Sequence, residues 1–225
     1  VTWYPNDGSG NFTTEHTISS TTLGASGLAF GDIDDNGSID VAVTAYDGNN
    51  VVWFANDGVD ADGFGTANTI DNTLANPGSI NLKDIDGDGD LDAIVTTAIW
   101  PIVSTDVVKI FRNDLYPANA GVSWTEVTNP VDSGLRYMFN ATFEDLDGNA
   151  NLDILASEVE NDPNAGSFYW YEDGNSDPYD GSAFTKTNWT TSIGNPAAAQ
   201  LHDLDDDGLF SCPANPQRQV VSPGD

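Results

Sequence analysis

The side chains best suited to chemistry in this sequence are carboxylate and amide groups that alternate along four acidic loops. The loops span residues 32–40, 84–92, 145–153 and 203–211, and they begin 52, 61 and 58 residues apart. Alternate side chains of a tight loop share one side, so positions one, three and five bring three oxygen donors together. Position seven offers its backbone carbonyl, and position nine returns a carboxylate in the first three loops. Such a set suits a hard divalent cation that takes six to eight oxygens.

Calcium is the cation that this pattern favours. Magnesium keeps several of its waters, and zinc prefers His or Cys ligands, which the loops lack. The pattern departs from an EF-hand at position twelve, where Val43, Val95 or Ala156 stands in place of the required Glu. Each loop is placed before or after a predicted strand rather than between helices. We therefore expect three to four bound Ca²⁺ ions that stabilise the fold.

The loops belong to a repeat with further landmarks in fixed order. Aromatic segments that end in turn-forming residues recur at 3–8, 53–58, 110–114 and 169–174. An aromatic residue in a short β-like run follows each of them, at Phe12, Phe64, Trp124 and Phe184. A period of this size indicates a repeat array.

The elements that position the loops read as short strands throughout. Apolar runs precede the loops at 27–30, 79–82, 138–143 and 197–201, and β-rich runs follow the first three at 41–44, 91–96 and 152–155. The aromatic segment supplies a third strand, and Asn-Asp-Gly is strong turn chemistry leading into a fourth. Four antiparallel strands per repeat are typical of a β-propeller blade. The sequence predicts an all-β fold of about four blade equivalents.

The array is expected to occupy residues 1–208, followed by an atypical tail, 209–225. The chain begins with a third and a fourth strand and ends with a first strand and its loop. Three arrangements stay open: closure at four blades, pairing with another copy, or membership of a longer array.

These loops and their spacing resemble those of the FG-GAP/VCBS repeat family, in which Asp-x-Asp-x-Asp-Gly-x-x-Asp loops join the first two strands of a blade in integrin-like β-propellers. The resemblance implies one Ca²⁺ for each loop. Ala150 and Ser211 depart from the family pattern, at the turn glycine of the third loop and at the ninth position of the fourth. The implied ligands are Asp32, Asp34, Asn36, Ser38 (carbonyl) and Asp40; Asp84, Asp86, Asp88, Asp90 (carbonyl) and Asp92; Asp145, Asp147, Asn149, Asn151 (carbonyl) and Asp153; and Asp203, Asp205 and Asp207.

The overall charge excludes several classes of partner. Thirty-six acidic against six basic residues give a net charge of −30, which repels nucleic acid and anionic lipid headgroups. No run of eighteen apolar residues occurs, so no membrane insertion is expected. The single Cys212 cannot form an internal disulfide. Stability outside the cell must then come from packing or metal.

Catalytic motifs are sparse, so no catalytic residue is assigned and a binding role is favoured over an enzyme. The two histidines, His16 and His202, lie in different repeats. The enzyme alternative is a polysaccharide lyase, or a domain attached to one, and a cleft that joins Lys or Arg with Tyr or His would favour it.

The favoured interpretation is a secreted or cell-surface module for binding or adhesion, and similar propellers include lectins. Its partner is expected to be a glycan or a cell-surface protein. Loops at the ends of a rigid scaffold commonly carry recognition, so Trp100, Tyr116 and Trp189 are candidate ligand contacts. A third interpretation is a structural surface-layer or filament subunit that forms homo-oligomers through open blade edges.

Overall fold

The computed structural model describes residues 1–59, 63–99, 105–115, 122–127, 131–146, 149, 151–158, 167–173, 179 and 184–191. All regular secondary structure in these ranges is β-strand, which confirms the predicted all-β class. Three large antiparallel sheets follow one another along the chain, preceded by a two-stranded hairpin.

The first and third sheets are four-stranded meanders in chain order. The first contains β3 (Ala25–Gly31), β4 (Asp40–Ala45), β5 (Asn50–Phe54) and β6 (Asn68–Asp71). The third contains β12 (Met138–Glu144), β13 (Asp153–Glu158), β14 (Ser167–Asp173) and β15 (Phe184–Thr191). Both sheets match the predicted order of strands within a repeat.

The middle sheet differs at its outer edge. It contains β7 (Pro77–Lys83), β8 (Asp92–Thr97), β9 (Asp106–Asn113), β10 (Trp124–Glu126) and β11 (Asp132–Leu135). Both β10 and β11 pair with β9, where the sequence predicted a single fourth strand. The long β9 offers enough backbone groups for two short partners in succession.

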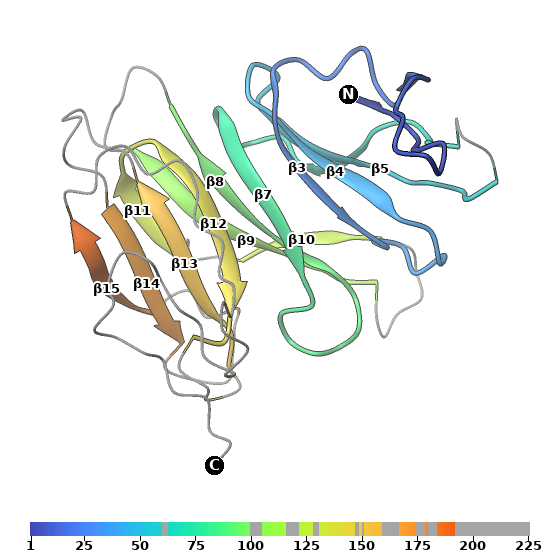
Figure 1. Cartoon of the computed structure of the whole chain (residues 1–225). Helices are drawn as coiled ribbons and strands as arrows, with labels where there is room; N and C mark the ends of the chain where they lie inside the picture. Colours follow the sequence, from blue (N-terminus) through green and yellow to red (C-terminus); the bar gives the residue numbers. More distant parts are fainter. Residues whose placement is uncertain are drawn as a thin grey trace.

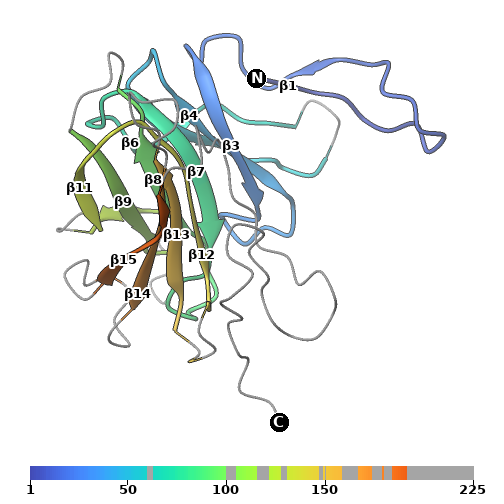
Figure 2. The same cartoon turned by 60° about the vertical axis from the view of Figure 1, so that its left-hand side comes forward.

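The amino-terminal hairpin is shorter than predicted. Its strands are β1 (Thr2–Trp3) and β2 (His16–Thr17), and Figure 2 shows the hairpin in blue, reaching out beyond the first sheet. Phe12, predicted to begin the second of these strands, lies outside it and is exposed. The segment before it forms turns, because Asn6 and Asp7 accept local backbone N–H groups from Gly8 and Ser9.

The three large sheets lie side by side with their first strands adjacent. β7 packs against β3 on one side and against β12 on the other, as Figure 1 shows. A threonine at the same position of the second strand joins each pair of neighbouring sheets. The Thr44 hydroxyl donates to the Gly78 carbonyl at 2.8 Å, and the Thr96 hydroxyl donates to the Met138 carbonyl at 3.1 Å. Both threonines are buried.

Apolar side chains fill the two spaces between the large sheets. Between the first and the middle sheet, the core includes Trp53, Ile80 and Phe111. Between the middle and the third sheet, it includes Ile110 and Tyr171. A third, smaller cluster on the other face of the first sheet, Val41, Val43, Val52 and Phe54, packs against Val1, Ile18 and Phe64. The first and the middle sheet are thus covered on both faces at least in part.

Candidate metal centres

Each of the first three acidic loops joins the first and second strands of its sheet. Loop 32–40 connects β3 to β4, loop 84–92 connects β7 to β8, and loop 145–153 connects β12 to β13. Because the three sheets lie side by side in the same orientation, the loops follow the same end of each sheet (Figure 1).

The ninth residue of each loop is a fully buried aspartate that closes the loop. One carboxylate oxygen accepts the backbone N–H of the second loop residue. The other accepts an N–H from the last residue of the third strand or, in the first loop, from the second residue after that strand. For Asp40 the donors are Ile33 at 2.8 Å and Asn56 at 2.7 Å; for Asp92, Ile85 at 3.1 Å and Asn113 at 2.8 Å; for Asp153, Leu146 at 3.0 Å and Asp173 at 3.0 Å. The repeat found in the sequence therefore recurs as a repeat of hydrogen bonds.

The first residue of each loop organises the turn from the other end. Asp32 accepts the N–H groups of Asn36 at 3.0 Å and Gly37 at 2.8 Å. In the second loop Asp84 accepts those of Gly87 at 2.8 Å and Gly89 at 3.2 Å. The sixth-position glycines adopt left-handed backbone angles, with φ of 88° at Gly37 and 101° at Gly89, which explains the glycine at this position.

Two loops bring three carboxylates close enough to hold one metal ion. The carboxylates of Asp32, Asp34 and Asp40 offer oxygens within 4.8 Å of one another, and so do those of Asp84, Asp86 and Asp88. All six donors are oxygens. This chemistry fits a hard cation and does not fit zinc or copper, which favour nitrogen or sulfur.

The fifth residue of each of these two loops, Asn36 or Asp88, accepts a local backbone N–H through its side chain. Asn36 Oδ1 accepts the Ser38 N–H at 2.8 Å, and its Nδ2 donates to the Asn56 carbonyl at 3.0 Å. Asp88 Oδ1 accepts the Asp90 N–H at 3.1 Å in the same position of the second loop. In both loops the fifth-position oxygen thus lies against the N–H of the seventh residue.

The third loop repeats the same hydrogen bonds as far as it is described. Asp145 accepts the Asn149 N–H at 3.1 Å, and Asn149 Oδ1 accepts the Asn151 N–H at 2.7 Å. Asp153 is buried as in the other loops. Asp147 lies outside the described residues, as do Asp203, Asp205 and Asp207 of the fourth loop, the tail 209–225, and the candidate contacts Trp100 and Tyr116. Trp189 lies in β15, with its side chain outside the described part of the structure.

One contact of the second loop was not foreseen in the sequence. The Tyr179 hydroxyl donates to Asp92 Oδ2 at 2.7 Å, and the Arg112 guanidinium lies 5.4 Å from the centre of the Tyr179 ring. Tyr179 is 87 residues from Asp92 along the chain. No spacing or motif signals such a pair, because it depends on how the third sheet packs beside the second.

Burial of Asp92 affects its protonation when no metal is bound. Loss of water around the carboxylate raises the pKa of Asp92 to about 7, although the Tyr179, Asn113 and Ile85 hydrogen bonds act in the opposite direction. Burial likewise raises the pKa of Asp40. The ninth position is thus a site where charge is costly without a compensating cation.

The metal-free protein is therefore expected to lose stability as the pH rises from about 4 to about 7. The unfolded Asp92 has a pKa of about 3.9, so in this window the folded state holds a proton that the unfolded state has lost. Urea unfolding in chelator at pH 5 and pH 7.5 measures the difference. Asp92→Asn, which cannot ionise, is the control and should show a weaker pH dependence. Equal slopes for both proteins would contradict the assignment to Asp92.

A second polar network joins a lysine with two tyrosines at β14 and β15. Lys186 lies 3.8 Å from the centre of the Tyr169 ring and 2.6 Å from Asp132, which also accepts the Tyr171 hydroxyl at 2.8 Å. The Tyr169 hydroxyl donates to Glu158. Burial and then the charge of Asp132 raise the pKa of Tyr171. A tyrosine base is therefore disfavoured here, although the residue types match those sought for the lyase alternative.

Comparison with known proteins neither supports nor contradicts the resemblance to the FG-GAP/VCBS family. Within the described residues, no helix is long and apolar enough to cross a membrane. No protein-family model and no curated protein matches the chain.

Proposed function

We propose that this chain is a calcium-binding β-propeller whose acidic loops each hold one Ca²⁺ and that serves as a module for binding or adhesion. The observation that carries the proposal is the pair of aspartate clusters, Asp32–Asp34–Asp40 and Asp84–Asp86–Asp88. The three loops also share one closing hydrogen bond, from the second-position N–H to the ninth-position aspartate, and this repetition adds support for the proposal. Three to four ions are expected for the chain.

Calcium is favoured over other cations by the donors and their exposure. The loop carboxylates Asp86 and Asp88 are exposed, so a metal ion can reach them and keep part of its water shell. Ca²⁺ tolerates six to eight oxygens in irregular geometry, whereas Mg²⁺ demands near-ideal octahedral placement. Backbone carbonyls of Ser38, Asp90 and Asn151 would complete the sets.

The function of the metal in this proposal is structural. A bound Ca²⁺ supplies positive charge where three carboxylates converge. The ninth-position aspartates Asp40, Asp92 and Asp153 already link each loop to the third strand through the backbone. With the repulsion among these carboxylates removed, the free energy of metal binding becomes free energy of folding. Loops that are held in this way offer a rigid edge for recognition.

The proposed ligand is a glycan or a cell-surface protein, and the proposed location is secreted or cell-surface. Exposed loops of this kind bind Ca²⁺ at the millimolar concentrations found outside cells. An accessory domain of a polysaccharide-degrading enzyme and a surface-layer subunit remain the alternatives from other classes. The resemblance to lectin-like propellers favours the binding role.

Calorimetric titration of Ca²⁺ into chelator-treated protein tests the metal sites directly. We expect at least two sites, with Mg²⁺ binding at least tenfold more weakly. Asp88→Asn should remove one site, and Asp47→Asn, which removes one exposed carboxylate outside the loops, is the matched charge control. Protein loaded with Ca²⁺ and metal-free protein would then be compared on a glycan array. If the titration showed no heat of Ca²⁺ binding, the loops would be solvated turns only, and the proposal would lose its basis.

A further inference from the structure

A buried asparagine at the end of β9 links the first acidic loop to the second. The backbone N–H of Asn113 donates to Asp92 of the second loop at 2.8 Å. The side-chain Nδ2 of Asn113 donates to the Ile33 carbonyl of the first loop at 3.1 Å, across 80 residues of sequence. Both residues of this second contact are fully buried, so water does not compete for the hydrogen bond. One residue thus holds two loops that belong to neighbouring sheets.

The contact with Ile33 completes a chain of hydrogen bonds between the closing aspartates of the two loops. The Ile33 N–H donates to Asp40 Oδ2 at 2.8 Å, and the Ile33 carbonyl accepts the Asn113 amide. The Asn113 N–H then donates to Asp92 Oδ1. All four residues have an exposed fraction of 0%. In a buried environment such bonds are stronger than in water, and each bond in a chain polarises the next.

The side chain of Asn113 contributes through its donor rather than through its acceptor. Asn113 Oδ1 is buried and has no hydrogen-bond partner in the described part of the structure. A buried oxygen in that state costs free energy, which an apolar side chain of similar size would avoid. Exchanging the two amide atoms would turn Oδ1 toward the Ile33 carbonyl, and two acceptors cannot pair. The favourable contribution of the side chain therefore comes from the bond between the two sheets.

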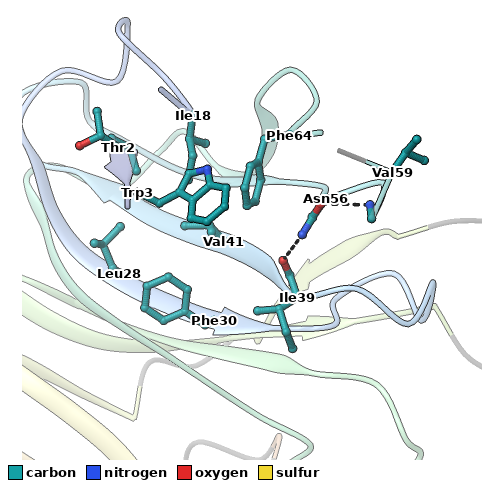
Figure 3. A pocket seen from close by; sticks show the side chains of 12 residues that line it. Thr2, Trp3, Ile18, Leu28, Phe30, Ile39, Val41, Asn56, Val59 and Phe64 are labelled. Carbon is teal, nitrogen blue, oxygen red and sulfur yellow. Dashed lines mark hydrogen bonds between the residues drawn. The ribbon is translucent and has the colours of Figure 1, made fainter. Parts of the chain in front are cut away.

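The same position of the first sheet provides an internal comparison. The backbone N–H of Asn56 donates to Asp40 at 2.7 Å, just as that of Asn113 donates to the closing aspartate of the second loop. The side-chain Nδ2 of Asn56, however, donates to the Ile39 carbonyl of its own loop at 3.1 Å, as Figure 3 shows. At this point Asn56 lines an apolar groove of about 440 Å³. Of these two asparagines, only Asn113 joins one loop to another.

We propose that Asn113 is a positioning residue that couples the first two acidic loops, so that Ca²⁺ bound in either loop raises the affinity of the other. This inference rests on the proposed calcium sites. Without an ion, repulsion among Asp32, Asp34 and Asp40 loosens the first loop. An ion there fixes Asp40 and, through Ile33, the amide of Asn113. The second loop is then already ordered and loses less conformational entropy when its own ion binds.

Amide hydrogen exchange, measured by NMR as free Ca²⁺ is raised, follows each site separately. The Ca²⁺ midpoint of protection for amides 84–92 reports the second loop, and that for amides 32–40 reports the first. Asp34→Ala, which removes a carboxylate of the first cluster, is expected to raise the second-loop midpoint about fivefold or more. Asp88→Ala should raise the first-loop midpoint by the same factor, because coupling between binding sites is reciprocal. Asp47→Ala removes an exposed carboxylate outside the loops and is the charge control.

Asn113→Leu tests whether this residue carries the coupling. The variant keeps the backbone N–H that Asp92 accepts and removes only the side-chain donor. With the other loop disabled, each midpoint should stay within about twofold of its value before the Asn113 change. The effect of one loop on the other should vanish. Asn56→Leu, which removes a bond within the first loop, is the matched control and should keep a coupling factor of about fivefold or more.

The other outcomes separate this inference from the proposed function. If neither loop of the wild type gained protection with Ca²⁺, the proposed function and the coupling would both be wrong. Protection in both loops with independent midpoints, or a second site weakened by a filled first loop as repulsion between two cations predicts, overturns the coupling alone. Coupling that persists in Asn113→Leu, with both midpoints merely shifted, would make Asn113 a structural residue only. Should Asn113→Leu fail to fold, Asn113→Ala takes its place under the same criterion.

Discussion

Removing divalent cations with a chelator is expected to lower the Tm of this protein by roughly 10–20 °C. A ligand at one hundred times its Kd stabilises the folded state by about 2.7 kcal/mol for each site. Two sites, at Asp32–Asp34–Asp40 and Asp84–Asp86–Asp88, would contribute about 5 kcal/mol. For a chain of 225 residues, each kcal/mol shifts Tm by about 2–4 °C. Further filled loops would enlarge the shift.

Differential scanning calorimetry in chelator, and again after Ca²⁺ is restored, measures this shift. Salt alone screens the repulsion within a chain of charge −30, so the control is NaCl at matched ionic strength. Mg²⁺ at the same concentration as Ca²⁺ tests the selectivity. If NaCl restored the Tm as fully as Ca²⁺, the stabilisation would be general screening rather than binding at the loops.

Asp92→Ala is expected to destabilise the protein by about 3–6 kcal/mol even when no metal is present, whereas Asp88→Ala is expected to cost little without metal. Asp92 is buried and accepts the N–H groups of Ile85 and Asn113 and the hydroxyl of Tyr179. Truncation leaves these three donors without their acceptor, at a cost of about 1–3 kcal/mol for each buried group. Relief of the buried charge offsets part of this cost. Asp88 is exposed and accepts one N–H within its own loop.

Urea unfolding of both variants, with chelator and with Ca²⁺, separates the two functions of the loop. Asp88→Ala should match the wild type in chelator and lose most of the gain that Ca²⁺ gives through this loop. Asp92→Ala should be destabilised in both conditions. Should both variants match the wild type in chelator, the buried hydrogen bonds of the ninth position would contribute no net stability, and its conserved spacing in the three loops would reflect metal binding alone.

These experiments distinguish a folding function of the loops from a metal-binding one. In the first two loops the carboxylates of Asp32, Asp34, Asp84, Asp86 and Asp88 are exposed or partly exposed, and the repulsion among neighbouring carboxylates is the reason for a cation. The ninth position is buried and holds the loop to the third strand with or without metal. One nine-residue segment thus carries two kinds of group, one turned toward solvent and one toward the core.

The sequence by itself determined the all-β class, the meander order of the strands and the three loops that join first to second strands. These features are local: alternation, turn residues and spacing act over fewer than ten residues. The left-handed glycines Gly37 and Gly89 stand where the pattern required them. The Phe184 landmark begins β15, and Trp124 begins β10. Phe12 and Phe64 did not begin regular strands of the predicted kind.

Only the tertiary structure decided which groups meet across the sheets. The Tyr179 hydroxyl donates to Asp92, the Thr44 hydroxyl donates to the Gly78 carbonyl, and the Lys186 ammonium lies over the Tyr169 ring. The contrast between exposed Phe30 and buried Phe143 is also invisible in the sequence, because both residues are phenylalanines at the same position of a repeat. Burial depends on which sheet lies beside the residue, and that is settled by packing between segments tens of residues apart.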